Sequence, residues 1–255
     1  MTASGEAVVV IPARFGSVRL PGKPLLRRTG KYLVQHVVER AREAELVSRV
    51  LVATDDHRIV DALEAEGIDV MLTSSEHPCG TDRVREAVSR LKGDVRVVVN
   101  VQGDEPETEP EVIDELVRSC GPESPFVTAA TAIHDEDVFR DPARVKVVRD
   151  ARGFALYFSR SPIPHHRDGR GGLPGEAWLH LGIYAYTPAI LERMSSLSPS
   201  PLETTESLEQ LRALENGISC LVRKVASISR GIDTPKDYED FVARYSRALQ
   251  RGGAR

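Results

Sequence analysis

Three cationic side chains cluster where the first apolar run of the chain ends. The run "AVVVIPA" (7–13) leads directly into "RFGSVRLPGKPL", which carries Arg14, Arg19 and Lys23 around a Pro-Gly turn. The run is typical of a strand buried on both faces, and ligands of open α/β sheets bind at the carboxyl edge of such strands. Arginine and lysine at this edge suit the oxygens of a polyphosphate. Charge and position alone fit a solvated surface loop equally well, and neither a P-loop nor a GxGxxG motif is present.

A second stretch places acidic groups at the end of another buried strand. In "VVVNVQGDEP" (97–106), Gln102, Asp104 and Glu105 emerge after the apolar residues. A carboxylate that faces a triphosphate repels it unless a divalent cation lies between them, and Mg²⁺ is held by one or two carboxylates, waters and phosphate oxygens. The alternative is a turn in which Asp104 caps the following helix. Taken alone, this stretch favours the turn; taken with the cluster of Arg14, Arg19 and Lys23, the metal interpretation gains support.

A third stretch, "GIDTPKDYEDF" (231–241), combines a helix start with a carboxylate. Thr234 at the N-cap and Pro235 at the first helical position form a favourable start. Asp233 is not needed for that start, so it is a candidate for a second metal ligand.

Two polar residues on apolar elements have structural alternatives. In "LHLGIYAY", His180 and Tyr184 fall on one face of a predicted strand. A lone histidine is more often a hydrogen-bonded structural residue than a catalyst, so we do not interpret His180 as a general base. Glu209 lies at helical spacing with leucines and, without further information, would belong to a solvated face.

The elements around these residues predict an α/β protein. Apolar runs at 7–11, 49–54, 68–72 and 95–102 alternate with helical patterns, which predicts a mainly parallel sheet with helices on both faces. In the helix that begins at 81, Thr81 is the expected N-cap. After about residue 125 the pattern changes to strands joined by short turns, which predicts an antiparallel part. We divide the chain, as one structural domain overall, into the parts 1–125, 126–217 and 218–255.

Composition limits the function classes and the location. The net charge of -4 argues against general nucleic-acid binding. The three cysteines, Cys79, Cys120 and Cys220, are far apart and odd in number, which argues against zinc pairs and a disulfide scaffold. No signal peptide or apolar run of about 20 residues is apparent. We therefore expect a cytoplasmic protein that acts on small molecules, with no nucleic-acid or membrane partner.

Taken together, the motifs resemble one enzyme family. The segments "IPARFGSVRLPGKPL", "CGTDR", "NVQGDEP", "VKVV", "ALYFSR", "HLGIYAY", "LEQLRALENG" and "GIDTPKDYE" occur in the order found in the 3-deoxy-manno-octulosonate (Kdo) cytidylyltransferases, also called CMP-Kdo synthetases. The resemblance covers residues 7 to about 243. It implies a Rossmann-like, GT-A-like nucleotidyltransferase part at 1–125, a smaller antiparallel sugar-binding and dimerisation part at 126–217, and a return to the core with a C-terminal helix at 218–255.

The resemblance also implies roles for individual residues. Arg14, Arg19 and Lys23 match the residues that bind the CTP phosphates, and with Asp104 they form the expected catalytic group. Asp104 and Asp233 match the Mg²⁺ ligands. The remaining nucleotide-binding matches are Thr81, Arg83 and Gln102. The sugar-binding matches are Gln102, Arg160, His180, Tyr184, Glu209 and Gln210. The chain departs from the family with Cys79 and Asp82, where serine and glutamate are common, and with histidines in "SPIPHHRDG".

The implied reaction is CTP plus Kdo giving CMP-Kdo plus pyrophosphate, for lipopolysaccharide biosynthesis, with Mg²⁺ as cofactor and a homodimer as the assembly. Two alternatives stay open at this point. One is a cytidylyltransferase for a related sugar acid, such as 8-amino-Kdo or a nonulosonic acid. The other is a catalytically inactive nucleotide-binding module.

Overall fold

The chain folds as an α/β protein in two compact units. The computed structural model describes residues 5–17, 19–167, 173, 176–226 and 230–252. The first unit comprises Val8–Lys92, Asn100–Pro110 and Ser229–Arg255. The second comprises Met1–Ala7, Gly93–Val99 and Glu111–Ile228.

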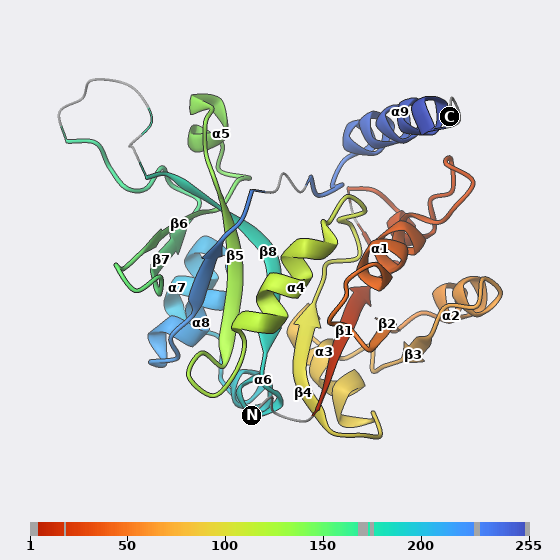
Figure 1. The fold of residues 1–255 in the computed structure, drawn as a ribbon, viewed down its shortest axis with the longest axis horizontal. Helices are drawn as coiled ribbons and strands as arrows, with labels where there is room; N and C mark the ends of the chain where they lie inside the picture. Colours follow the sequence, from red (N-terminus) through yellow and green to blue (C-terminus); the bar gives the residue numbers. More distant parts are fainter. Residues whose placement is uncertain (1–4, 18, 168–172, 174–175, 227–229, 253–255) are drawn as a thin grey trace. The chain divides into compact units, whose positions relative to one another are not determined.

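Parallel strands form the centre of the first unit. Strands β1 (Glu6–Ala13), β2 (Arg49–Thr54) and β3 (Val70–Leu72) pair in the order β3-β2-β1, all parallel. The residues from Val8 to Ile11 are fully buried, which confirms that β1 is covered on both faces. The crossovers that parallel pairing requires contain α1 (Leu33–Arg42) and α2 (His57–Glu64), and Figure 1 shows α1 alongside β1.

Among its described residues, the first unit contains three further helical segments. They are the 3₁₀ turn η1 (Lys23–Leu25), α3 (Gly80–Ser89) and α9 (Pro235–Gly252). Helix α3 begins one residue earlier than the sequence suggests, with Cys79 as its N-cap, so the prediction of Thr81 as N-cap is wrong. Thr81 is a buried residue of the first turn. For α9, the predicted start at Thr234 and Pro235 is confirmed, since Thr234 Oγ1 accepts a hydrogen bond from the Asp237 amide at 3.2 Å.

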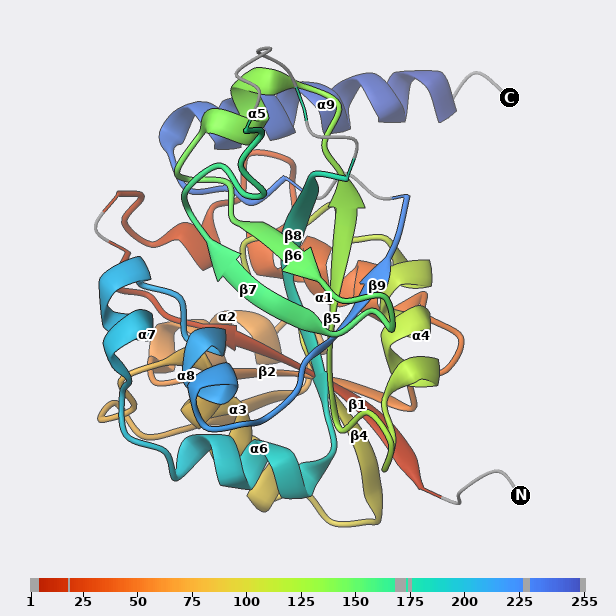
Figure 2. The same cartoon turned by 90° about the vertical axis from the view of Figure 1, so that its left-hand side faces the viewer.

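The second unit is mainly antiparallel, as expected for the region after residue 125. Strand β8 (Trp178–Tyr186) pairs antiparallel with β5 (Phe126–Ala132) and with β6 (Lys146–Arg149), and β6 forms a hairpin with β7 (Ala155–Ser159). Strand β9 (Leu221–Lys224), which the sequence analysis missed, pairs parallel with β5. Figure 2 shows the β6–β7 hairpin and the two long strands β5 and β8. Strand β4 (Val95–Asn100) lies next to β8.

The expected boundaries at residues 125 and 217 do not coincide with those of the units. Helix α4 (Pro110–Ser119) and strand β9 group with the antiparallel part, since β9 completes the sheet beside β5. The other helices of this unit are α5 (Glu136–Arg140), α6 (Pro188–Ser195), α7 (Pro201–Glu206) and α8 (Gln210–Glu215).

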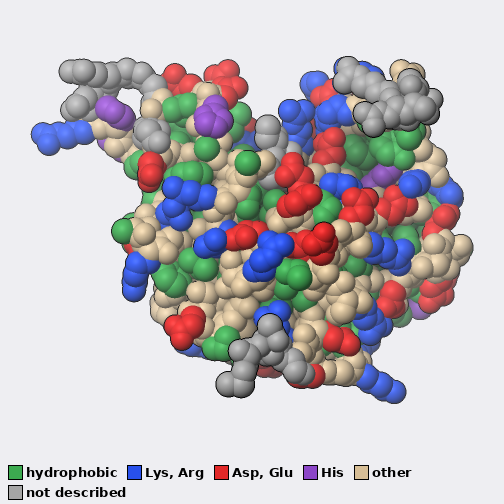
Figure 3. Space-filling view, in the orientation of Figure 1, with side chains coloured by type: hydrophobic (Ala, Val, Ile, Leu, Met, Phe, Trp, Pro, Cys, Tyr) green, Lys and Arg blue, Asp and Glu red, His purple; other side chains and the backbone are tan. Residues whose placement is uncertain are grey.

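Two features of the structure concern membranes and nucleic acids as possible partners. Within the described ranges, none of the helices has the length and apolar character needed to cross a bilayer. On the face drawn in Figure 3, acidic and basic side chains are interspersed, so that face carries no continuous basic surface.

Candidate active site

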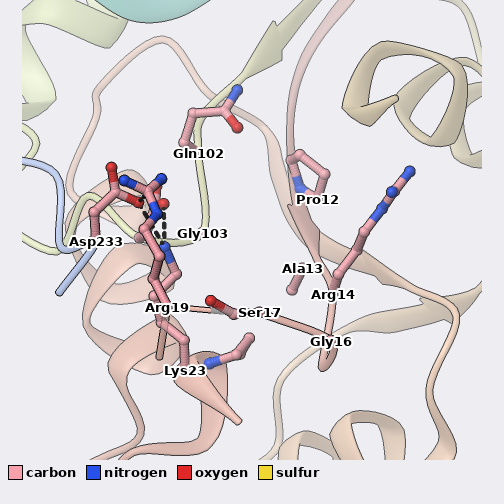
Figure 4. Close-up of a pocket in the computed structure, with 12 residues that line it drawn as sticks. Pro12, Ala13, Arg14, Gly16, Ser17, Arg19, Lys23, Gln102, Gly103 and Asp233 are labelled. Carbon is pink, nitrogen blue, oxygen red and sulfur yellow. Dashed lines mark hydrogen bonds and ion pairs between the residues drawn. The ribbon is translucent and has the colours of Figure 1, made fainter. Parts of the chain in front are cut away.

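A pocket of about 280 Å³ lies at the carboxyl end of β1 in the first unit (Figure 4). Four short segments line it: the end of β1 with the turn after it, η1, the turn after β4, and the residues before α9. The lining residues are Pro12, Ala13, Arg14, Gly16, Ser17, Arg19, Lys23, Pro24, Gln102, Gly103, Asp104 and Asp233. The pocket thus brings together six of the residues that the sequence singled out.

Lys23 is the centre of an ionic cluster in this pocket. Its Nζ lies 2.6 Å from Asp104 Oδ2 and 3.3 Å from Asp233 Oδ1, and it also donates to the carbonyl oxygen of Ile232 at 2.8 Å. Arg19 Nη2 lies 3.2 Å from the same oxygen of Asp233. The Lys23 side chain is only 13% exposed, whereas that of Arg19 is 67% exposed. Two cations and two carboxylates therefore converge at one place.

The Pro-Gly turn directs Lys23 toward the carboxylates. Gly22 adopts the left-handed conformation (φ 66°) and precedes η1, which begins at Lys23. A side chain at position 22 would meet the ring of Phe15 at 3.3 Å and would also strain the backbone. Leu20 packs in the same apolar cluster as Ile232, which anchors the turn next to the segment that carries Asp233.

A backbone hydrogen bond joins the two segments that carry the carboxylates. The amide of Ile232 donates to the Asp104 carbonyl at 2.9 Å, so the two acidic segments are joined directly. Asp104 pairs with Lys23, and helix α4 begins only at Pro110, so the alternative of Asp104 as a helix cap is wrong. Gly103 is a glycine for a steric reason, because a Cβ there would lie 2.9 Å from the Pro12 carbonyl oxygen.

Arg14 and Gln102 lie apart from the ionic cluster. Arg14 Nη2 donates to the carbonyl oxygen of His77 at 2.5 Å, and Figure 4 shows its side chain across the pocket from Asp233. Gln102 Nε2 donates to Asn100 Oδ1 at 3.3 Å. His77, which the sequence analysis missed, contacts Arg14 through its backbone, so its residue type gave no signal.

Thr81 and Arg83 are buried in α3 and are not lining residues of this pocket. The Arg83 side chain is fully buried; its guanidinium lies 2.6 Å from Asp55 Oδ2 and donates to Thr73 Oγ1 at 2.6 Å. These contacts tie α3 to the residues after β2 and β3. The structure therefore gives Arg83 a structural role within the first unit.

The residues matched to the sugar side belong to the second unit. Arg160 follows β7, and its guanidinium donates to the carbonyl oxygens of Glu206 and Pro142 at 2.7 and 3.0 Å. Glu209 is the N-cap of α8, and Gln210 is its first residue. Gln210 Nε2 is buried without a hydrogen-bond partner among the described residues. A buried amide of this kind is a candidate donor to a ligand.

His180 and Tyr184 lie on one face of β8, as expected, but closer than a regular strand allows. In a regular strand, the Cα atoms of residues four positions apart are separated by about 13 Å, and their side chains stand roughly parallel. The ring centroids of His180 and Tyr184 are only 5.4 Å apart. The cause is a bulge: Ala129 pairs with Leu181 and Thr128 pairs with Tyr184. The sequence pattern predicted the shared face but contained no signal for the bulge.

His180 is neutral at physiological pH. Burial lowers its pKa to about 3 because the charged imidazolium would lose its hydration. Thr128 Oγ1 donates to the Ile183 carbonyl at 2.7 Å, so it accepts from His180 Nε2 at 3.0 Å, and Nδ1 is the unprotonated nitrogen. A neutral ring that already donates its Nε2–H to Thr128 has Nδ1 as its acceptor and does not suit general acid chemistry.

The chemistry of the Asp104 and Asp233 pair fits Mg²⁺ when phosphate oxygens complete the coordination. Among the described residues, no three His, Cys, Asp or Glu side chains are arranged to hold a metal by themselves. Two carboxylates are present, however, and both already contact the same cationic nitrogen. Mg²⁺ is commonly bound by one or two carboxylates together with substrate phosphates.

Comparison with known proteins decides the family. A sequence profile described as cytidylyltransferase matches residues 8–225. The chain belongs to the cytidylyltransferase family. Within this family, a 3-deoxy-manno-octulosonate cytidylyltransferase of Anaeromyxobacter sp. (strain Fw109-5) is 49% identical over 98% of this chain and 99% of its own. One from Syntrophotalea carbinolica is 47% identical over 89% and 94%, respectively.

A solved structure agrees with this assignment. A CMP:2-keto-3-deoxy-manno-octonic acid synthetase in complex with CTP superposes with a TM-score of 0.89 and 41% identity, covering 96% of this chain and 100% of the other. The cytidylyltransferase family therefore accounts for both the sequence and the fold of the chain, and the resemblance seen in the motifs is confirmed.

Proposed function

We propose that the protein activates the sugar acid Kdo by transferring a cytidylyl group from CTP, giving CMP-Kdo and pyrophosphate for lipopolysaccharide biosynthesis. The observation that carries this proposal is the convergence of Lys23, Arg19, Asp104 and Asp233 in one pocket of a cytidylyltransferase. The names of its relatives and the CTP complex of a 41% identical neighbour support the choice of nucleotide and sugar.

In this proposal the pocket holds the triphosphate. Arg14, Arg19 and Lys23 bind phosphate oxygens and stabilise the charge that moves onto pyrophosphate as the bond to the α-phosphorus breaks. The anomeric hydroxyl of Kdo is the nucleophile, so no side chain needs to become covalently attached. Gln102, at the edge of the same pocket, serves the nucleotide and the sugar.

Asp104 and Asp233 hold Mg²⁺ in this proposal. When bound, the metal polarises phosphate oxygens and lowers the pKa of the attacking hydroxyl. The protein's own part is to keep the two carboxylates together: the Ile232 amide fixes the Asp104 backbone, and the Asp237 side chain accepts from the Asp233 amide at 3.1 Å.

The second unit supplies the sugar contacts. Arg160 offsets the carboxylate charge of the sugar acid, and the neutral His180 offers Nδ1 as a hydrogen-bond acceptor without adding charge. Tyr184, Glu209 and Gln210 complete the set, with the unpaired Nε2 of Gln210 as a donor to a sugar hydroxyl. A cytoplasmic homodimer is the setting that we propose for this reaction.

An acceptor panel tests the substrate. Purified protein with CTP and Mg²⁺ is given Kdo, 8-amino-Kdo or a nonulosonic acid, and the products are identified by mass. We expect CMP-Kdo as the main product. A strong preference for another acid would replace Kdo as the substrate, and CTP binding without turnover on any acid would indicate an inactive nucleotide-binding module.

A further inference from the structure

The position of Lys23 between the two proposed metal ligands has a consequence for the order of binding. We propose that Lys23 is an internal counter-ion that occupies the cation position of Asp104 and Asp233 until a nucleoside triphosphate draws it away. The divalent cation then binds with or after the nucleotide, and not before it. This inference rests on the proposed function, because it assigns metal binding to those carboxylates.

The first argument is geometric. An ammonium group has three N–H donors, and Lys23 Nζ has three oxygen partners: Asp104 Oδ2, Asp233 Oδ1 and the Ile232 carbonyl at 2.6, 3.3 and 2.8 Å. A Mg²⁺ ion held by both carboxylates would lie about 2.0–2.1 Å from an oxygen of each, which places it in the space between Asp104 and Asp233 that the ammonium group occupies. Both cations therefore compete for one position.

The second argument is electrostatic. The charges of Asp104 and Asp233 are balanced by those of Lys23 and Arg19, so the cluster as a whole offers a bare divalent cation little net attraction. The Lys23 side chain is only 13% exposed, which limits the screening of its repulsion toward a second cation. Lys23 therefore opposes metal binding as long as it stays between the carboxylates.

A triphosphate reverses this balance. Its oxygens are anionic and compete with Asp104 and Asp233 for the ammonium of Lys23, and the pocket that holds Lys23 is the one proposed for the phosphates. Once Lys23 turns to the phosphates, Asp104 loses its ion-pair partner while Asp233 keeps its contact with the exposed Arg19, and a divalent cation replaces the lost positive charge. Nucleotide and metal then bind cooperatively, and by linkage each strengthens the binding of the other by the same factor.

The size of the effect depends on how rarely Lys23 leaves the carboxylates in the free protein. Apparent metal affinity is reduced by the fraction of molecules in the binding-competent state. Removal of the ammonium makes all molecules competent with respect to this contact. A Lys23→Met substitution is therefore expected to tighten metal binding in the absence of nucleotide, even though it removes a group that the reaction needs.

The test measures Mn²⁺ binding without nucleotide, from the electron paramagnetic resonance signal of the free ion. We expect Lys23→Met to bind Mn²⁺ about tenfold or more tightly than the wild-type protein, and Lys23→Met combined with Asp104→Asn to lose that gain. Lys31→Met is the matched control: it removes the same charge from an ion pair with Glu39 at 2.6 Å, outside the lining of the pocket, and should leave Mn²⁺ binding unchanged.

Equal Mn²⁺ affinity of Lys23→Met and the wild-type protein would overturn the inference, as would an equal gain in Lys31→Met. If Lys23→Met does not fold, wild-type protein and Asp104→Asn decide the matter: we expect both to bind Mn²⁺ equally weakly without nucleotide, and a tight site that depends on Asp104 would contradict this. The acceptor panel tests the enzyme activity separately, so failure of either proposal can be recognised.

Discussion

Lys23 Nζ lies 2.6 Å from the Asp104 carboxylate, although the two residues are 81 positions apart in the chain. This contact joins η1 to the turn after β4 within one unit. Because Lys23 also reaches Asp233, three motifs that were recognised separately in the sequence form one site. The ionic cluster is the physical basis for the proposed handling of a magnesium–triphosphate.

Arg19 is the most exposed member of the cluster, so its removal should affect nucleotide binding more than it affects the fold. We expect Arg19→Ala to raise the KM for CTP by about tenfold, because a charge-assisted contact to phosphate is lost. The fold should be unchanged, since 67% of the side chain is exposed. Steady-state kinetics with CTP as the varied substrate measures this. Unchanged KM and kcat would refute a phosphate-binding role for Arg19.

Arg83 should matter for stability. Its guanidinium is fully buried against Asp55 and Thr73, and removal of one partner of a buried pair costs about 3–5 kcal/mol. We expect Arg83→Met to lower the free energy of unfolding by about this amount in denaturant titrations. The control is Arg90→Met, which removes an exposed ion pair with Glu86 from the end of the same helix and should change stability by less than about 1 kcal/mol. A stable Arg83→Met protein with weakened CTP binding would instead favour direct nucleotide contact.

His180 should make stability depend on pH in the acid range. Its pKa is about 3 in the folded protein and near 6.5 in the unfolded chain. Above pH 6.5 the ring is neutral in both states and contributes no pH dependence. Between about pH 6.5 and 3 the unfolded state binds the proton more readily than the folded state, so stability is lost as the pH is lowered, by up to about 1.4 kcal/mol per pH unit.

Chemical unfolding at several pH values tests this. His180→Gln should show a shallower loss of stability below pH 6.5 than the wild-type protein. Burial also lowers the pKa of His36, so part of the slope will persist in the variant. Equal slopes for His180→Gln and wild type would show that His180 takes up a proton in the folded state.

Substitution of Arg160 should affect the binding of Kdo and of CTP differently. If its guanidinium offsets the carboxylate of the sugar acid, Arg160→Met should raise the KM for Kdo by about tenfold or more and leave the KM for CTP unchanged. Arg144→Met is a suitable control because Arg144 is a half-exposed arginine of the same unit whose ion pair with Asp141 is long, at 4.0 Å. Equal increases in both KM values would indicate a general disturbance of the fold.

The sequence predicted most of the parallel unit because its signals are local. Buried strands are continuous apolar runs, and Val8 to Ile11 are indeed inaccessible. Pro235 marks the start of α9 regardless of its surroundings. The carboxylates and cations of the pocket were recognisable because each follows such a signal, and the sheet edge brings them together.

What the sequence did not predict depends on contacts between distant segments. Strand β9 is four residues long and is stabilised by pairing with β5, so it has no pattern of its own. The bulge that brings Tyr184 close to His180 depends on the register with β5. The family resemblance implied a nucleotide-binding role for Arg83, and its burial against Asp55 became evident only from the packing of α3.

The central claim is that Asp104 and Asp233 together hold the metal that the reaction requires, and pyrophosphate release tests it most directly. Wild-type protein should release pyrophosphate from CTP only when both Kdo and Mg²⁺ are present. Asp104→Asn and Asp233→Asn should each reduce the rate by about 100-fold or more while retaining the wild-type circular dichroism spectrum. Near-normal rates for either variant at saturating Mg²⁺ would contradict the account.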